Sequence, residues 1–92
     1  MSQLPIVFHS HALERMIERG VTEDEVRSTI REGERFAVKF GRSGFRRNFP
    51  FEREWNGRRY QTKQVEVIAV EENEGWLVIT IISRFFGRME ES

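Results

Sequence analysis

Residues 10–33, SHALERMIERGVTEDEVRSTIREG, contain two helical patterns, and a glycine follows each of them. In the first pattern, apolar residues recur at positions i, i+3 and i+4: Leu13, Met16 and Ile17. This spacing predicts a helix over residues 11–19 with one apolar stripe facing the core. Ser10 is the expected N-cap, because its hydroxyl can accept a hydrogen bond from a free amide of the first turn. Gly20 suits the left-handed residue that ends a helix.

The second pattern begins with Thr22-Glu23-Asp24-Glu25, which is typical of a capping box. In such a box, the side chains of Thr22 and Glu25 each bond to the other residue's backbone amide. The three acids also suit the positive end of the helix dipole. Gly33 is the expected end of this helix, and its buried side is expected to carry Val26, Thr29 and Ile30.

From Glu34 onward, the period of the apolar residues changes to two, which predicts strands. Strands are expected over residues 35–40, 45–55, 58–71 and 76–82, with Val65, Val67 and Ala69 on one face of the third. Turns are expected at Gly41–Gly44 and Glu72–Gly75, and Asn56-Gly57 is the clearest hairpin signal. Pro50 indicates an edge strand or a bulge. The almost wholly apolar run 76–82 is the expected central strand.

The order of these elements predicts one α+β domain over residues 1–92. Two N-terminal helices pack on a twisted antiparallel sheet of about four strands. The chain has 38% hydrophobic and 33% charged residues, a composition that excludes a disordered or membrane-spanning protein. It has no cysteine, which excludes disulfides and favours the cytoplasm. His9 and His11 lack a third ligand at a suitable spacing, so neither a metal site nor a cofactor is expected.

The formal net charge is +0, but the charges are unevenly distributed along the chain. Residues 35–64 contain nine Lys or Arg against Glu52 and Glu54. Such a basic middle can meet RNA or an acidic partner protein, and the alternative is a set of solvated strand faces. The candidate binding residues in this segment are Arg46, Arg47, Arg58, Arg59 and Tyr60.

His11, Arg15 and Arg19 form a polar stripe, because each is about 40° from the next at 100° per residue. The stripe is expected to face away from the apolar side of its helix. A histidine can act as an acid or base near neutral pH, and arginines can stabilise a phosphate. An ordinary solvated helix face is the alternative.

Two further cations, Lys63 and Arg84, lie within or at the end of predicted strands. Hairpin geometry is expected to bring them to one face of the sheet, and surface cations covering apolar neighbours are the alternative. Trp55, Tyr60 and Trp76 are able to stack on bases, although Trp76 fits the core better.

Residues 11–26, HALERMIERGVTEDEV, resemble the opening H-A-x-x-R-M-x-x-R-G-(I/V) of domain-of-unknown-function family 4258. Residues 55–65, WNGRRYQTKQV, and 78–80, VIT, resemble the second and third blocks of that family. The resemblance extends from Phe8 to Phe86. The family is grouped with small ribonuclease-like toxins of the RelE and BrnT kind, which implies two helices packed on an antiparallel sheet.

This grouping implies metal-independent RNA cleavage, in which the ribose 2′-hydroxyl attacks the adjacent phosphate. The resemblance implies that His11 is the base or acid, that Arg15 and Arg84 stabilise the phosphate and that Lys63 assists; Arg19 would bind phosphate. The first hypothesis is therefore a ribonuclease-like toxin, or an inactive relative of one, that an acidic antitoxin covers. The alternative is a non-catalytic RNA- or protein-binding module that uses the basic strands. A homodimer through an edge at residues 49–51 is a third hypothesis.

Overall fold

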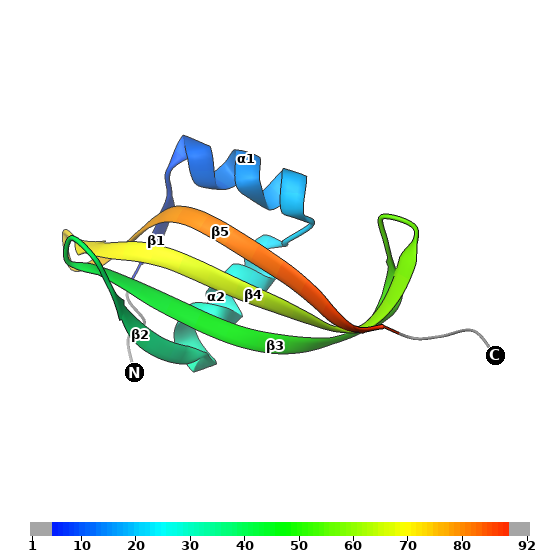
Figure 1. Ribbon diagram of the computed structural model, residues 1–92. Helices are drawn as coiled ribbons and strands as arrows, with labels where there is room; N and C mark the ends of the chain where they lie inside the picture. The colour runs from blue at the N-terminus through cyan, green and yellow to red at the C-terminus, as the bar shows by residue number, and fades with distance from the viewer. Residues whose placement is uncertain (1–4, 89–92) are drawn as a thin grey trace.

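The structure is a computed structural model, and it describes residues 5–88. Two helices pack on a five-stranded sheet of order β1-β5-β4-β3-β2, in which every neighbouring pair is antiparallel except β1 with β5 (Figure 1). This arrangement confirms the predicted α+β class. The elements in chain order are β1 (Ile6–Phe8), α1 (Ser10–Arg19), α2 (Glu23–Glu32), β2 (Glu34–Val38), β3 (Arg42–Trp55), β4 (Arg58–Glu72) and β5 (Gly75–Arg88).

The sequence did not predict β1, because three residues are too few to show a period of two. β1 pairs in parallel with residues 76–78 of β5. The part of β5 beyond residue 78 pairs only with β4 among the described strands. The predicted central strand 76–82 is therefore central at its start and an edge strand afterwards.

The helix termini agree with the sequence at three of four positions. Gly20 has φ 64° and ends α1, the Thr22–Glu25 capping box starts α2, and Gly33 ends α2. The prediction for Ser10 is wrong by one residue, because the N-cap is His9, whose Nδ1 accepts a hydrogen bond from the backbone of His11. Neither described helix has the length and apolar content needed to cross a membrane.

Helix α1 is rotated relative to the expectation. Its buried residues are Ala12 and Met16, whereas Leu13 is 48% exposed and Ile17 is 84% exposed. The predicted apolar stripe is therefore wrong at two of its three positions. The small side chain of Ala12 permits close approach to the sheet, and the guanidinium of Arg19 reaches a β5 carbonyl, so the arginine side of the helix faces the sheet edge.

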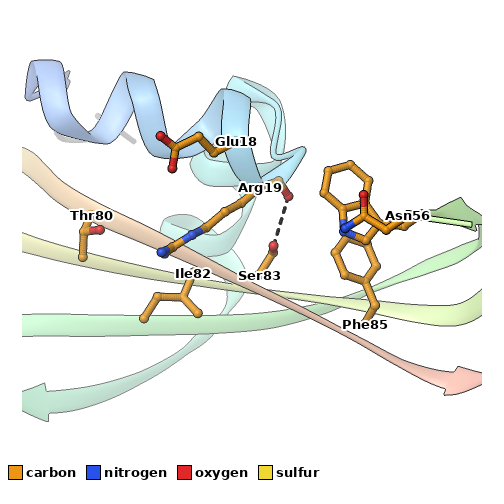
Figure 2. A pocket seen from close by; sticks show the side chains of 8 residues that line it. Glu18, Arg19, Asn56, Thr80, Ile82, Ser83 and Phe85 are labelled. Carbon is orange, nitrogen blue, oxygen red and sulfur yellow. Dashed lines mark hydrogen bonds between the residues drawn. The ribbon is translucent and has the colours of Figure 1, made fainter.

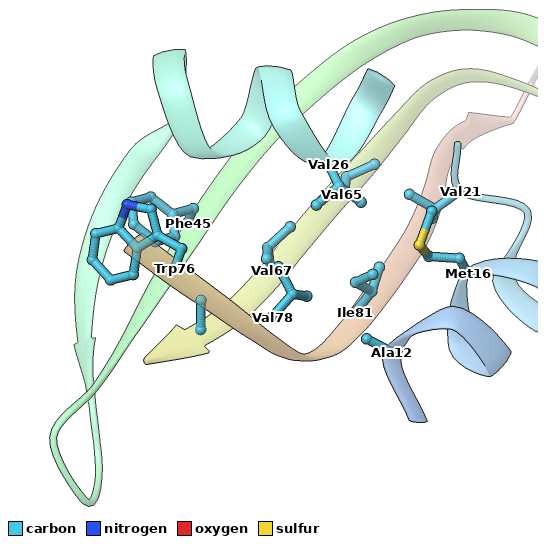
Figure 3. Packing of buried hydrophobic residues seen from close by; sticks show 11 residues of the cluster. Ala12, Met16, Val21, Val26, Phe45, Val65, Val67, Trp76, Val78 and Ile81 are labelled. Carbon is cyan, nitrogen blue, oxygen red and sulfur yellow. The ribbon is translucent and has the colours of Figure 1, made fainter. Parts of the chain in front are cut away.

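The core lies between the two helices and one face of the sheet (Figure 3). Val65, Val67 and Ala69 share this face as predicted, and all three are fully buried. Val26 and Thr29 of α2 are also fully buried, which confirms the expected inner side of that helix. The other buried apolar residues are Ala12, Met16, Val21, Phe45, Trp76, Val78 and Ile81.

Two turns and a β-bulge shape the ends of the sheet. Asn56 and Gly57 have φ 51° and 81° between the paired residues Trp55 and Arg58, which confirms the predicted hairpin. The β3–β4 register shifts between Pro50 and Arg53, so the expected bulge is present. The turn predicted at residues 41–44 lies earlier, at residues 39–41, and Phe40 is 88% exposed there instead of belonging to a strand.

Lys63 connects β4 to the turn between the helices. Its side chain is 3% exposed, and its Nζ donates hydrogen bonds to the Gly20 carbonyl oxygen and to Oε1 of Glu25, the latter at 2.7 Å. The same carboxylate oxygen accepts the backbone amide of Thr22. One buried ammonium group therefore holds the end of α1 and the start of α2 on the sheet.

Replacing Lys63 by methionine keeps the length of the side chain and removes these hydrogen bonds. We expect Lys63→Met to lower the free energy of unfolding by about 2–4 kcal/mol, because breaking a buried ion pair is strongly destabilising and Glu25 keeps some solvent contact. Urea unfolding measures this change. The matched control is Arg58→Met on the same strand, where the exposed cation is expected to contribute less than about 0.5 kcal/mol. Equal losses for the two variants would contradict the structural role of Lys63.

Candidate functional site

The two ends of the α1 polar stripe lie in different surroundings. His11 is at the N-terminal end, where its side chain is 67% exposed and its ring stacks on that of His9. Arg19 is eight residues away, which corresponds to about 12 Å along the helix. Between them, Arg15 forms an ion pair with Glu18 at 2.9 Å. The stripe therefore extends along the length of α1, but only its C-terminal end contacts the sheet.

Arg19 fastens this end of α1 to the edge of β5 (Figure 2). Its guanidinium donates a hydrogen bond to the carbonyl oxygen of Ile81 at 2.6 Å, and the Ser83 hydroxyl donates to the carbonyl oxygen of Arg19 at 3.0 Å. Among residues 5–88, no carboxylate lies within ion-pair distance of Arg19. The guanidinium is thus held in place by a neutral carbonyl oxygen, so its positive charge remains available to an anion.

Lys63 and Arg84 do not lie on one face of the sheet, so that expectation is wrong. Lys63 is opposite Phe85 and Arg84 is opposite Gln64, and neighbouring residues of a strand point to opposite faces. Lys63 lies beneath the helices, whereas Arg84 is on the uncovered face with its Nη1 3.6 Å from Glu66. The four proposed catalytic residues therefore do not converge on one surface.

The fold neutralises much of the basic middle segment. Arg46 binds Oε1 of Glu66 at 2.9 Å, and Arg47 binds Glu32 at 2.6 Å. These acids come from β4 and α2, which lie far from their arginines in sequence. Arg46 and Arg47, two of the candidate binding residues, consequently form ion pairs within the domain.

The cations of the β3–β4 hairpin have different neighbours. Arg53, Arg58 and Arg59 are exposed, and none of them forms an ion pair within residues 5–88. Arg53 lies over the Phe51 ring at 4.8 Å, and Arg59 donates to the carbonyl oxygen of Glu52 at 3.1 Å. Three exposed cations of the segment therefore lie at this end of the sheet.

An aromatic cluster supports the hairpin. Trp55 stacks on Phe85 with ring centroids 5.0 Å apart, and Tyr60 lies 5.8 Å from the same phenyl ring. The indole of Trp55 also covers Gly20, where a β-carbon would overlap the ring. The hairpin end thus folds toward the α1–α2 turn.

An open pocket of about 670 Å³ lies between the end of α1, β5 and the hairpin. This volume is within the usual range of small-molecule sites. Figure 2 shows Arg19 reaching across β5 below Glu18, with Asn56 and Phe85 at the hairpin side. The lining residues are Glu18, Arg19, Trp55, Asn56, Thr80, Ile82, Ser83 and Phe85.

The sequence had singled out only part of this pocket. Arg19 and Trp55 were candidates from their own patterns, and His11 was a candidate that the pocket does not include. Glu18, Ser83 and Phe85 were missed, because their places in the pocket depend on which distant segments the fold brings together, as the Ser83–Arg19 hydrogen bond across 64 residues illustrates. The helical spacing of Glu18 and Arg15 was a signal for an ion pair, not for a pocket.

The chemistry of the pocket combines a cation, a carboxylate, two hydroxyls and stacked aromatic rings. In the described range 5–88, no three His, Asp or Glu residues gather as metal ligands would. Compared with known proteins, residues 8–83 match the family model described as Domain of unknown function (DUF4258). Neither a curated protein nor a solved structure matches the chain. Because the match covers most of the 92 residues, the chain belongs to the DUF4258 family.

Proposed function

We propose that this protein binds single-stranded RNA in the pocket between α1, β5 and the β3–β4 hairpin. The observation that carries the proposal is the position of the Arg19 guanidinium, which has no carboxylate partner within residues 5–88 and shares a pocket with the Trp55–Phe85 stack. A guanidinium can bind a phosphate while an aromatic ring stacks on a base. Single strands are favoured because only unpaired bases can stack on such side chains.

The hairpin extends this surface beyond the pocket. Arg53, Arg58 and Arg59 carry three positive charges, and Glu52 and Glu54 carry two negative ones, which leaves a net charge of +1. Counterion release depends on the number of phosphates neutralised, so this small excess supports only a shallow salt dependence. Stacking on Trp55 is then the main source of affinity.

The first test measures binding of labelled single-stranded poly(A) and poly(U) by fluorescence anisotropy, with a duplex of matching length for comparison. We expect Trp55→Ala to weaken single-strand binding by about 5- to 150-fold, since stacking contributes about 1–3 kcal/mol per base. In the Trp76→Phe background, RNA should quench the fluorescence of Trp55.

Phe40→Ala is the matched control, because Phe40 is an 88% exposed aromatic residue in the turn between β2 and β3, away from the hairpin. This variant is expected to bind as the wild type does. Equal affinity of Trp55→Ala and the wild type, or binding of duplex alone, would contradict the proposed site.

A second candidate function is metal-independent cleavage of the bound RNA, and the position of Glu18 favours it. Glu18 lines the pocket beside Arg19, and its carboxylate is held by Arg15 at 2.9 Å. A carboxylate there can take the proton of a ribose 2′-hydroxyl as its oxygen bonds to phosphorus, while arginines stabilise the charge; the bond from phosphorus to the 5′-oxygen then breaks, and that oxygen takes a proton from water. The kinship with RelE and BrnT toxins that the sequence resemblance implies would fit this activity.

The cleavage candidate assigns the base to Glu18 instead of His11. We expect the wild type to cleave RNA in the presence of a chelator, and Glu18→Gln to lower the rate by about 100-fold or more. His11→Ala should leave the rate unchanged, because His11 does not line the pocket. Gel electrophoresis of end-labelled RNA follows the reaction. Intact RNA at high protein concentration would exclude cleavage and leave the binding proposal in place.

A further inference from the structure

The face of the sheet opposite the helices carries several apolar side chains that no described helix covers. Among the described residues, α1 and α2 pack on the face that carries Val65 and Val67. Antiparallel sheets that face water on one side usually carry polar residues there. This uncovered face presents partly or largely exposed apolar side chains beside its polar ones, among them Val7, Phe36, Val38, Ile68, Val70, Leu77 and Ile82.

A row of charged residues crosses the same face. The row runs from Glu34 on β2 through Arg46 on β3 to Glu66 on β4. The Glu66 side chain is only 9% exposed, and a single carboxylate oxygen, Oε1, lies 2.9 Å from Arg46 and 3.6 Å from Arg84. Two guanidinium groups therefore share one carboxylate oxygen, and Arg84 is the more loosely held of the two.

The two most loosely paired charges, Glu34 and Arg84, lie on opposite sides of the face. Glu34 on β2 is 76% exposed. Its Oε1 lies 3.9 Å from Nη1 of Arg46, which is a long distance for an ion pair. Arg84 on β5 is 53% exposed, and its guanidinium is directed toward Glu66, which belongs to the charged row. Three strand spacings separate β2 from β5, which is about 14 Å, so the two side chains do not pair within one chain.

We propose that the uncovered face binds the same face of a second copy of this chain. A two-fold axis parallel to the strands would place β5 of one copy over β2 of the other, as in aligned sheet packing. Arg84 of each copy then faces Glu34 of the other, so two reciprocal ion pairs flank the apolar residues. The formal net charge of +0 means that two copies associate without net repulsion.

This surface differs from the edge at residues 49–51 that the sequence suggested for a dimer. Pro50 cannot donate a ladder hydrogen bond, and the adjacent register shift distorts that edge. A face-to-face contact also explains why a sheet face without a helix carries Phe36 and Ile68. Glu34 and Arg84 carry opposite charges on opposite sides of the uncovered face. The charges of this face are therefore complementary to those of the same face on a second copy.

The test measures the mass of the full chain by sedimentation across a range of concentrations. The wild type is expected to sediment as a dimer of twice 11.0 kDa. Arg84→Glu and Glu34→Arg each place like charges opposite one another, so each variant alone should raise the dimer dissociation constant by about tenfold or more. An equimolar mixture of the two variants restores both ion pairs, and it should form a heterodimer as tightly as the wild type.

Arg31→Glu on the exposed side of α2 is the matched control and should leave dimerisation unchanged. Circular dichroism verifies that each variant is folded. If a reversed charge unfolds the chain, Arg84→Gln and Glu34→Gln supply the comparison, and each is expected to weaken the dimer. A wild type that is monomeric at every concentration would overturn the proposal. Folded single variants whose mixture stays monomeric would overturn it as well.

Discussion

Gly20 is the position on which the arrangement of helices, sheet and hairpin depends. Its positive φ ends α1, its carbonyl oxygen accepts a hydrogen bond from the buried ammonium of Lys63, and its bare α-carbon leaves room for the indole of Trp55. A side chain at this position would be strained by the φ angle and would overlap the indole ring. The α1–α2 turn, strand β4 and the hairpin therefore meet at one residue.

Charge pairing across the fold changes the meaning of the uneven charge distribution in the sequence. The acids that neutralise Arg46, Arg47 and Lys63 lie on β4 and α2. After folding, Arg53, Arg58 and Arg59, which form no ion pair among residues 5–88, lie at the hairpin end of the sheet. This redistribution moves the candidate RNA surface from the strand faces to the hairpin and the end of α1.

The two proposed surfaces use different sides of β5. The pocket opens on the side where α1 meets the strand edge, and Arg84 lies on the uncovered face. The two surfaces overlap at Thr80 and Ile82, because both residues line the pocket and are paired with Ile68 and Glu66 of the uncovered face. A dimer through the uncovered face would thus leave the α1 side of each pocket open to a nucleotide.

Local signals in the sequence determined the end of α1, both ends of α2 and the β3–β4 hairpin, because capping boxes, left-handed glycines and Asn-Gly turns depend on neighbouring residues. They were sufficient for the α+β class, for the inner face of α2 and for the candidates Arg19 and Trp55. The three-residue strand β1 and the rotation of α1 were decided by tertiary structure, since both follow from contacts with β5. Tertiary structure also decided that Lys63 and Arg84 lie on opposite faces of the sheet and that Glu18 lines the pocket. Pairing register and long-range packing decide these features, and a single stretch of sequence contains neither.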